Sequence, residues 1–189
     1  MENYILLSTL NDFIFCPYSI YIHNIYNTNE EDINYAAPQK KGKAAHSSID
    51  EKKYSSSKND IVGLSVYSDE FKIMGKIDLY KSDEKFLVER KYQIKQIYQG
   101  QIYQIWGQYF CMLEMNYDVE KLAFYEISTN KMHPIDKPNS NDKEKFRQFI
   151  VEYINYNPET EISINENKCN YCIYCNLCDK TTVYNNLYD

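Results

Sequence analysis

The sequence predicts an α/β (α+β) fold in which a mixed central sheet is flanked by helices. Three strand-like segments, at 61–68, 71–81 and 85–92, follow one another in the middle of the chain. A helical pattern with apolar side chains along one face then runs from about 97 to 115. A further strand-like segment follows at 122–127.

Further helices are predicted in the N-terminal part. Ser8 or Thr9 can cap a first helix, and Pro17 can start a second helical stretch soon after it. A polar segment follows, and another helix is expected from residue 39 to about residue 54.

The C-terminal half is expected to add an edge strand and a helix. Pro134 makes 132–135 an edge element, because proline cannot donate to the hydrogen bonds of a sheet. Ser140 or Asn141 can cap the helix that follows.

The second and third strands are predicted to form an antiparallel hairpin, because the polar residues 81–84 between them are turn-like. Asp78 and Glu89 then lie near each other on adjacent strands. Since residues two apart in a strand face the same side, Glu89 and Lys91 point together and Arg90 points away. Two carboxylates and an amine that converge suit a divalent cation with a water beside it.

The alternative is that these charged side chains are ordinary surface residues of a solvated hairpin. Their neighbours favour the functional interpretation, because Ile77, Leu79, Leu87 and Val88 indicate strands that are largely covered. Charges on covered strands need a partner or a metal.

Glutamines form a column on the helix predicted at 97–115. Gln101, Gln104 and Gln108 recur at three- and four-residue spacing, so they share one face. They are either a polar rim or, behind the hairpin, donors to a substrate phosphate or a metal-bound water.

The helix expected at 39–54 carries a histidine and a group of lysines. Lys40, Lys41 and Lys43 are either a solvated face or a strip that guides a phosphate backbone toward His46. A single histidine on a helix is more often structural or exposed than a ligand.

Composition limits the classes of protein that remain. The 189 residues suffice for one domain, 1–189. A net charge of −6 argues against a passive DNA-coating protein and is compatible with an enzyme that clusters carboxylates around a metal. No apolar run approaches the roughly 20 residues needed to span a membrane, and the first residues lack the basic region of a secretory signal. We therefore expect a cytoplasmic protein with no membrane partner.

Four cysteines at three-residue steps, Cys169, Cys172, Cys175 and Cys178, predict ligation of a metal or a cluster. One possible ligand set is these four. The other adds Cys16 to three of them, and a Cys-x2-Cys-x5-Cys spacing would select Cys169, Cys172 and Cys178. Thiolate tetrads suit zinc or an iron–sulfur cluster, and the spacing alone leaves both open.

The order of these features resembles the RecB-type branch of the PD-(D/E)XK nucleases. A histidine on a helix is followed by Gly-x-x-Asp ending at Asp78, Glu-x-Lys from Glu89 to Lys91, a glutamine-bearing helix, and cysteines at both chain ends. The set is most similar to the CRISPR-associated exonuclease family (the fourth Cas protein), from Leu10 to Cys178. The resemblance implies a restriction-endonuclease-like core, with 1–27 and 160–189 joined by the cluster.

The resemblance also implies roles for individual residues. His46, Asp78, Glu89 and the backbone carbonyl of Arg90 would bind Mn²⁺ or Mg²⁺. The catalytic lysine would be Lys91, and the motif glutamine Gln104. Family members carry a tyrosine four residues after that glutamine, whereas position 108 here is Gln, so Gln101 and Gln108 stay alternatives. A structural four-iron–four-sulfur cluster would be held by Cys16, Cys169, Cys172 and Cys178, with Cys175 as the alternative fourth ligand.

The function that the resemblance implies is metal-dependent cleavage of single-stranded DNA or overhangs. Such an exonuclease would trim spacer precursors during CRISPR adaptation, in antiviral defence, together with the integrase complex. One alternative is a RecB-like nuclease of DNA repair or recombination. Another is a cluster-stabilised, non-catalytic adaptor that positions DNA in the adaptation complex.

Overall fold

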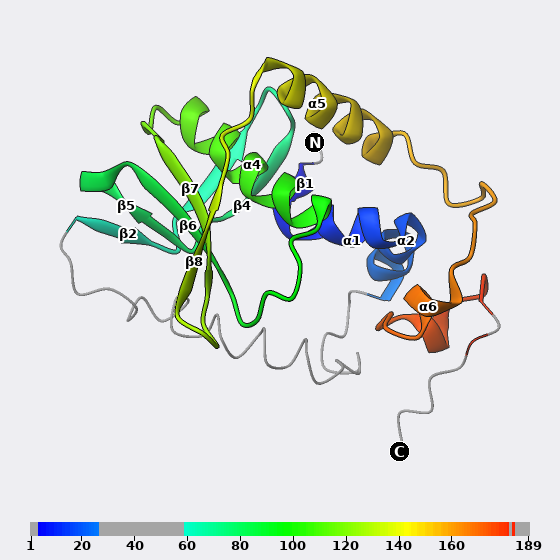
Figure 1. Ribbon diagram of the computed structural model, residues 1–189. Coiled ribbons are helices and arrows are strands. Elements are labelled where there is room, and N and C mark those ends of the chain that lie inside the picture. The colour runs from blue at the N-terminus through cyan, green and yellow to red at the C-terminus, as the bar shows by residue number, and fades with distance from the viewer. Residues whose placement is uncertain (1–3, 27–58, 182, 184–189) are drawn as a thin grey trace.

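The structure is a computed structural model that describes residues 4–26, 59–181 and 183 (Figure 1). The strands are β1 (Ile5–Leu6), β2 (Asp60–Val62), β3 (Ser65–Ser68), β4 (Ile73–Lys76), β5 (Leu79–Lys81), β6 (Phe86–Lys91), β7 (Lys121–Glu126) and β8 (Lys131–Ile135). The α-helices are α1 (Leu10–Phe15), α2 (Pro17–Tyr26), α4 (Gln99–Glu114), α5 (Ser140–Ile154) and α6 (Glu166–Cys169). Short 3₁₀ turns are η1 (Leu7–Thr9), η3 (Ser82–Glu84) and η4 (Cys175–Leu177).

The strands form two mixed sheets. In the smaller sheet the order is β1-β4-β3, with β1 parallel and β3 antiparallel to β4. The larger sheet has the order β2-β5-β6-β7-β8, in which only β6 and β7 pair in parallel. Helices α1, α2 and α6 gather at one end of the molecule, away from the larger sheet (Figure 1). This architecture confirms the predicted α/β class with helices flanking mixed strands, although the strands form two sheets where one central sheet was predicted.

The expectation of continuous strands at 61–68 and 71–81 is wrong, because each is broken in the middle. Gly63 has a positive φ of 65°, which glycine adopts at little cost. Opposite it the chain leaves β4 at Ile77 and enters β5 after Asp78. The two chains stay paired through the break, since Ile77 N–H donates to Leu64 O at 3.0 Å and Gly63 N–H donates to Asp78 O at 3.2 Å. The paired segments 60–68 and 73–81 therefore contribute β3 and β4 to the smaller sheet and β2 and β5 to the larger one. Asp78 lies where the two sheets join.

Most other predicted elements are confirmed. β5 and β6 form the expected antiparallel hairpin, with Leu79 opposite Val88. The helix expected at 97–115 is α4, and the strand expected at 122–127 is β7. β8 lies at the edge of its sheet, as Pro134 predicts.

The predicted helix caps need correction. Asn139, rather than Ser140 or Asn141, caps α5, and its Oδ1 accepts from the N–H of Asn141 at 2.8 Å. Thr9 precedes α1 but makes no side-chain cap, because its hydroxyl donates to Leu6 O at 2.8 Å. Pro17 begins α2 as expected.

Leu7 joins the N-terminal segment to the core. Its side chain is 2% exposed and fills the space beside two glycines, Gly75 of β4 and Gly107 of α4. A β-carbon on Gly107 would lie 2.4 Å from Leu7 Cδ2, and one on Gly75 would lie 3.0 Å from Leu7 Cβ. The absence of side chains at both positions therefore lets η1 pack directly between the small sheet and α4.

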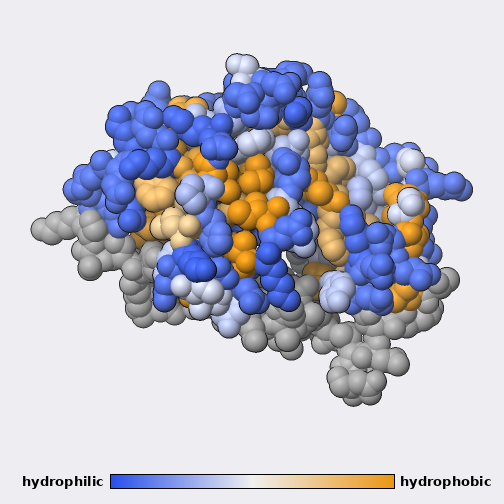
Figure 2. All heavy atoms as spheres, in the orientation of Figure 1, coloured by the Kyte–Doolittle hydropathy of each residue, from blue (hydrophilic) through white to orange (hydrophobic). Residues whose placement is uncertain are grey.

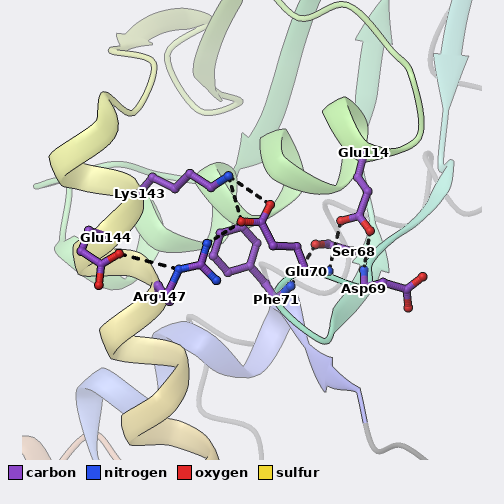
Figure 3. A network of polar contacts seen from close by, with 8 residues as sticks. All are labelled: Ser68, Asp69, Glu70, Phe71, Glu114, Lys143, Glu144 and Arg147. Carbon is purple, nitrogen blue, oxygen red and sulfur yellow. Dashed lines mark hydrogen bonds and ion pairs between the residues drawn. The ribbon is translucent and has the colours of Figure 1, made fainter.

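A polar network holds the turn between β3 and β4 against the helices (Figure 3). Glu114, at the end of α4, accepts from the N–H of Asp69 at 2.8 Å. Glu70 is paired with Lys143 and Arg147 of α5, and the Arg147 guanidinium lies 4.9 Å from the centre of the Phe71 ring. These contacts hold the end of the small sheet at which β3 turns into β4, which we call its far end, against α4 and α5.

The end of α1 and helix α2 lie beside the C-terminal segment of the described chain. Tyr18 donates to Asp179 at 2.5 Å, and Lys168 donates to Phe15 O at 2.8 Å. His23 Nδ1 and Tyr174 OH are 2.6 Å apart. Among the residues that the structure describes, no helix has both the length and the apolar character needed to cross a membrane.

Candidate active site

A pocket of about 340 Å³ opens where the small sheet, the hairpin and α4 meet. Its walls come from the N-terminal segment, the break between β4 and β5, β6 and α4. The lining residues are Leu6, Leu7, Ser8, Gly75, Lys76, Asp78, Glu89, Lys91 and Gln104. The polar residues predicted on the hairpin thus share one cavity with the glutamine predicted on the helix.

Glu89 is the centre of the polar contacts in this pocket. Its Oε1 atom accepts from Lys91 Nζ at 2.9 Å and from Gln104 Nε2 at 2.9 Å. Lys91 Nζ also donates to Gln104 Oε1 at 3.0 Å, so each of these three side chains is hydrogen-bonded to the other two. On the other side, Gln108 Nε2 donates to Glu89 Oε2 at 2.8 Å. The hairpin and α4 are therefore joined through one carboxylate.

Asp78 is held by the backbone of the neighbouring strand. Its Oδ2 atom accepts from the N–H of Arg90 at 2.7 Å. β5 pairs with β6 only as far as Val88, so Asp78 takes the place of a strand partner at Arg90. The N–H and C=O of one strand residue point to the same side. The Arg90 carbonyl therefore faces the side on which Asp78 lies.

Two carboxylates, those of Asp78 and Glu89, line this pocket together with the amines of Lys76 and Lys91. Asp78 is 8% exposed and Glu89 is 2% exposed, and the Lys91 amine donates to Glu89. Burial raises the pKa of Glu89, with Asp78 adding to the rise, while Lys91 and the Gln108 hydrogen bond act against it. A carboxylate has about four lone-pair positions, and the three hydrogen bonds to Glu89 leave one. Oxygen donors of this kind suit Mg²⁺ or Mn²⁺.

The three glutamines of the predicted column have different roles. Gln101 accepts from the N–H of Tyr98 at 3.0 Å and so caps α4. Gln104 and Gln108 both contact Glu89. Gln108 is 1% exposed and also donates to Lys76 O at 3.3 Å. The helical spacing placed both glutamines on one face, but it gave no reason to prefer Gln108 as a support for Glu89.

Glu126 is a site-supporting residue that the sequence did not single out. It is 5% exposed and lies opposite Lys91 in the register of β6 and β7. It accepts from the N–H of Ile94 at 3.1 Å, from Ser128 Oγ at 3.0 Å, and pairs with His133 at 3.2 Å. Since Ile94 lies in the loop between β6 and α4, Glu126 ties that loop to the sheet beside Lys91.

The remaining predicted residues of this site lie outside the described residues. They are His46 and the lysines Lys40, Lys41 and Lys43. The helix expected at 39–54 falls in the same range. Their predicted roles stay predictions.

The cysteines meet at a second pocket, of about 290 Å³, between α2 and the C-terminal segment. Its lining includes Cys16, Cys169, Cys172, Cys175 and Cys178. Burial raises the pKa of Cys172 to about 11, and the neighbouring Cys16, Cys175 and Cys178 add to the rise. The contact between α2 and the C-terminal segment thus brings Cys16 to the same pocket as cysteines more than 150 positions later.

Cys175 is positioned differently from the other cysteines. It is 3% exposed, and its Sγ donates to Val183 O at 2.9 Å. Cys16, Cys169, Cys172 and Cys178 are only partly buried. In the described part of the chain no three His, Cys, Asp or Glu side chains are arranged to hold a metal ion. Ligation would therefore require the thiols to turn toward one centre within their shared pocket.

The fold is that of an α/β protein with two mixed sheets flanked by helices, an architecture that is compatible with a nuclease-like core. A solved structure has a fold similar to that of this chain. The crystal structure of SSO0001 aligns with a TM-score of 0.63 and 16% identity, over 97% of this chain and 89% of that one. No protein-family model and no curated protein sequence matches the chain. The similarity is therefore one of fold.

Proposed function

We propose that the protein is a metal-dependent DNA exonuclease that acts on single-stranded DNA or overhangs. The observation that carries this proposal is the meeting of Asp78, Glu89, Lys91 and Gln104 in one pocket. Asp78, Glu89 and the Arg90 carbonyl would hold Mn²⁺ or Mg²⁺, with His46 as a further ligand. When bound, such a cation lowers the pKa of a coordinated water and stabilises charge on a phosphate.

Lys91 and Gln104 supply the part of the proposed mechanism that does not depend on the cation. Lys91 is fixed by Glu89 and Gln104, and these bonds use two of the three N–H donors of its ammonium. The third donor can bind a phosphate oxygen or orient the attacking water. A compact ammonium in a partly buried pocket is well suited to stabilise negative charge that grows in the transition state. Gln104 acts through Lys91 and Glu89 as a positioning residue.

The test is cleavage of an end-labelled single-stranded oligonucleotide in the presence of Mn²⁺. Lys91→Ala should lower the cleavage rate by about 100-fold or more, as loss of a charge-stabilising donor does in other enzymes. Asp78→Asn should act in the same direction because it weakens the cation site. Lys95→Ala, an exposed lysine on the following loop, is the matched control. A Lys91→Ala protein that cleaves at the rate of the parent would refute the assignment.

We propose that the cysteine pocket holds a structural four-iron–four-sulfur cluster on Cys16, Cys169, Cys172 and Cys178. Two observations support this ligand set. The four thiols line one pocket, and Cys175, which lines it too, already donates its S–H to Val183 O. Phosphodiester hydrolysis needs no electron, so the cluster would act by joining the chain ends.

In the cell, the proposed role is trimming of spacer precursors together with a CRISPR integrase complex. It rests on the order of motifs from Leu10 to Cys178. A neighbouring integrase gene and co-purification with the integrase are the expected findings. A neighbouring helicase gene with no integrase would instead favour the repair nuclease.

A further inference from the structure

The outer face of the small sheet runs directly into the candidate active site. The outward-facing side chains of its three strands are Leu6, Ser65, Tyr67, Met74 and Lys76. Two of them, Leu6 and Lys76, also line the catalytic pocket. A ligand that covers Leu6 or Lys76 on this face therefore reaches the pocket as well.

Three of these side chains form an exposed apolar row across the sheet. Tyr67 is opposite Met74, and Met74 is opposite Leu6. Their exposed fractions are 48%, 43% and 46%. Neighbouring strands lie about 4.8 Å apart, so the row is a continuous strip. Tyrosine at one end supplies a π-face on which a nucleic-acid base can stack.

The charges on this face suit a polyanion. The chain carries a net charge of −6, yet none of the five outward positions is acidic. Lys76 lies two residues beyond Met74 on the same face, which places a cation between the apolar row and the pocket. The acidic Glu70 at the far end of the sheet is neutralised by Lys143 and Arg147 (Figure 3).

We infer that the row of Tyr67, Met74 and Leu6 binds single-stranded DNA and guides it past Lys76 into the pocket. This inference rests on the proposed function and names the surface that would bind its substrate. The bases lie on the apolar row, and the phosphates pass Lys76. A single strand fits because its unstacked bases are accessible, whereas those of a duplex are stacked inside. A second copy of the chain is a weaker candidate, since a stable interface buries about 800 Å² per partner.

The experiment measures binding of a fluorescent oligo(dT) to the full-length protein by anisotropy in EDTA, so that cleavage plays no part. Tyr67→Ala should weaken binding by about fivefold or more, the lower end for loss of one stacked base. Tyr67→Trp keeps an aromatic face and should bind within about twofold of the parent. Tyr171→Ala is the control, because Tyr171 is 76% exposed but lies in the cysteine segment.

Several results would overturn the inference. One is unchanged oligo(dT) affinity for Tyr67→Ala. Another is an equally tight, equally Tyr67-dependent interaction with a blunt duplex. A third is a change in oligomeric state, measured by sedimentation, in place of a change in DNA binding. The proposed nuclease activity can fail separately, if the parent binds oligo(dT) through Tyr67 but cleaves nothing with Mn²⁺ or Mg²⁺.

Discussion

Gln108 Nε2 lies 2.8 Å from Glu89 Oε2, and both side chains are almost completely buried. This bond links the middle of α4 to the carboxylate at the centre of the pocket. Gln108 itself does not line the cavity. It therefore supports Glu89 from the side that faces away from the pocket.

Gln108→Ala should therefore destabilise the protein. The substitution leaves a buried carboxylate oxygen without its donor, and a hydrogen bond to a charged group contributes about 1.5–3 kcal/mol. The free energy of unfolding in urea measures the loss. Gln99→Ala, at an exposed position of the same helix, should change it by less than about 0.5 kcal/mol. Equal stability of the two variants would contradict the role given to this bond.

Gly107→Ala should destabilise the protein even though alanine is the better helix former. The propensity gain is about 1 kcal/mol, whereas overpacking costs about 1–3 kcal/mol, and the new β-carbon would meet Leu7 Cδ2 at 2.4 Å. The double-mutant cycle with Leu7→Ala isolates the contact. In the Leu7→Ala background, Gly107→Ala should be stabilising or neutral. A loss of the same size in both backgrounds would show that the two residues are independent.

Acid should lower the free energy of unfolding, and protonation of Glu126 should account for part of this loss. The hydrogen bonds from Ile94 N–H, Thr129, His133 and Ser128 lower the pKa of Glu126 from 4.5 to about 2, although burial acts against them. A carboxyl group whose pKa is lower in the folded state stabilises that state above its unfolded pKa. This contribution is lost as the pH falls from 4.5 toward 2. Glu126→Gln should accordingly lose less stability than the parent across that range.

Urea unfolding at a series of pH values measures this difference. Glu159→Gln, which changes an exposed carboxylate in a loop, is the control and should follow the parent. Parallel pH profiles for Glu126→Gln and the parent would exclude Glu126 as a source of the acid sensitivity.

Removal of single cysteines distinguishes the two possible ligand sets. Cys16→Ser and Cys178→Ser should lose bound iron and visible absorbance after anaerobic purification, because only three thiolates of the proposed set of four then remain. Cys175→Ser should keep both. Loss of iron from Cys175→Ser but not from Cys16→Ser would favour the local set. If the unsubstituted protein is colourless and contains only zinc, the assignment of an iron–sulfur cluster is wrong.

The sequence predicted the parts of the site that depend on local geometry. The two-residue period of a strand placed Glu89 and Lys91 on one side, and the short turn at 81–84 brought Asp78 near Glu89. Both follow from neighbours along the chain. The edge position of β8 likewise follows from Pro134 alone.

Other parts depend on packing between distant segments. The apolar residues on both sides of Asp78 hid the break between β4 and β5, because the same pattern suits one long strand. Leu7 reaches the pocket wall only because β1 pairs with β4, almost 70 positions later. That Gln104 and Gln108 both contact Glu89 depends on how α4 is rotated against the sheet, which its own sequence does not fix.

The joint at Ile77 and Asp78 also limits how the length of this chain can change. Extra residues at the tip formed by η3 would extend an exposed turn and leave the register of β5 and β6 intact. One residue inserted between Lys76 and Asp78 would instead shift the alternation by one and carry the carboxylate to the opposite face. Insertions are therefore compatible with this hairpin at its tip and incompatible with it at its base.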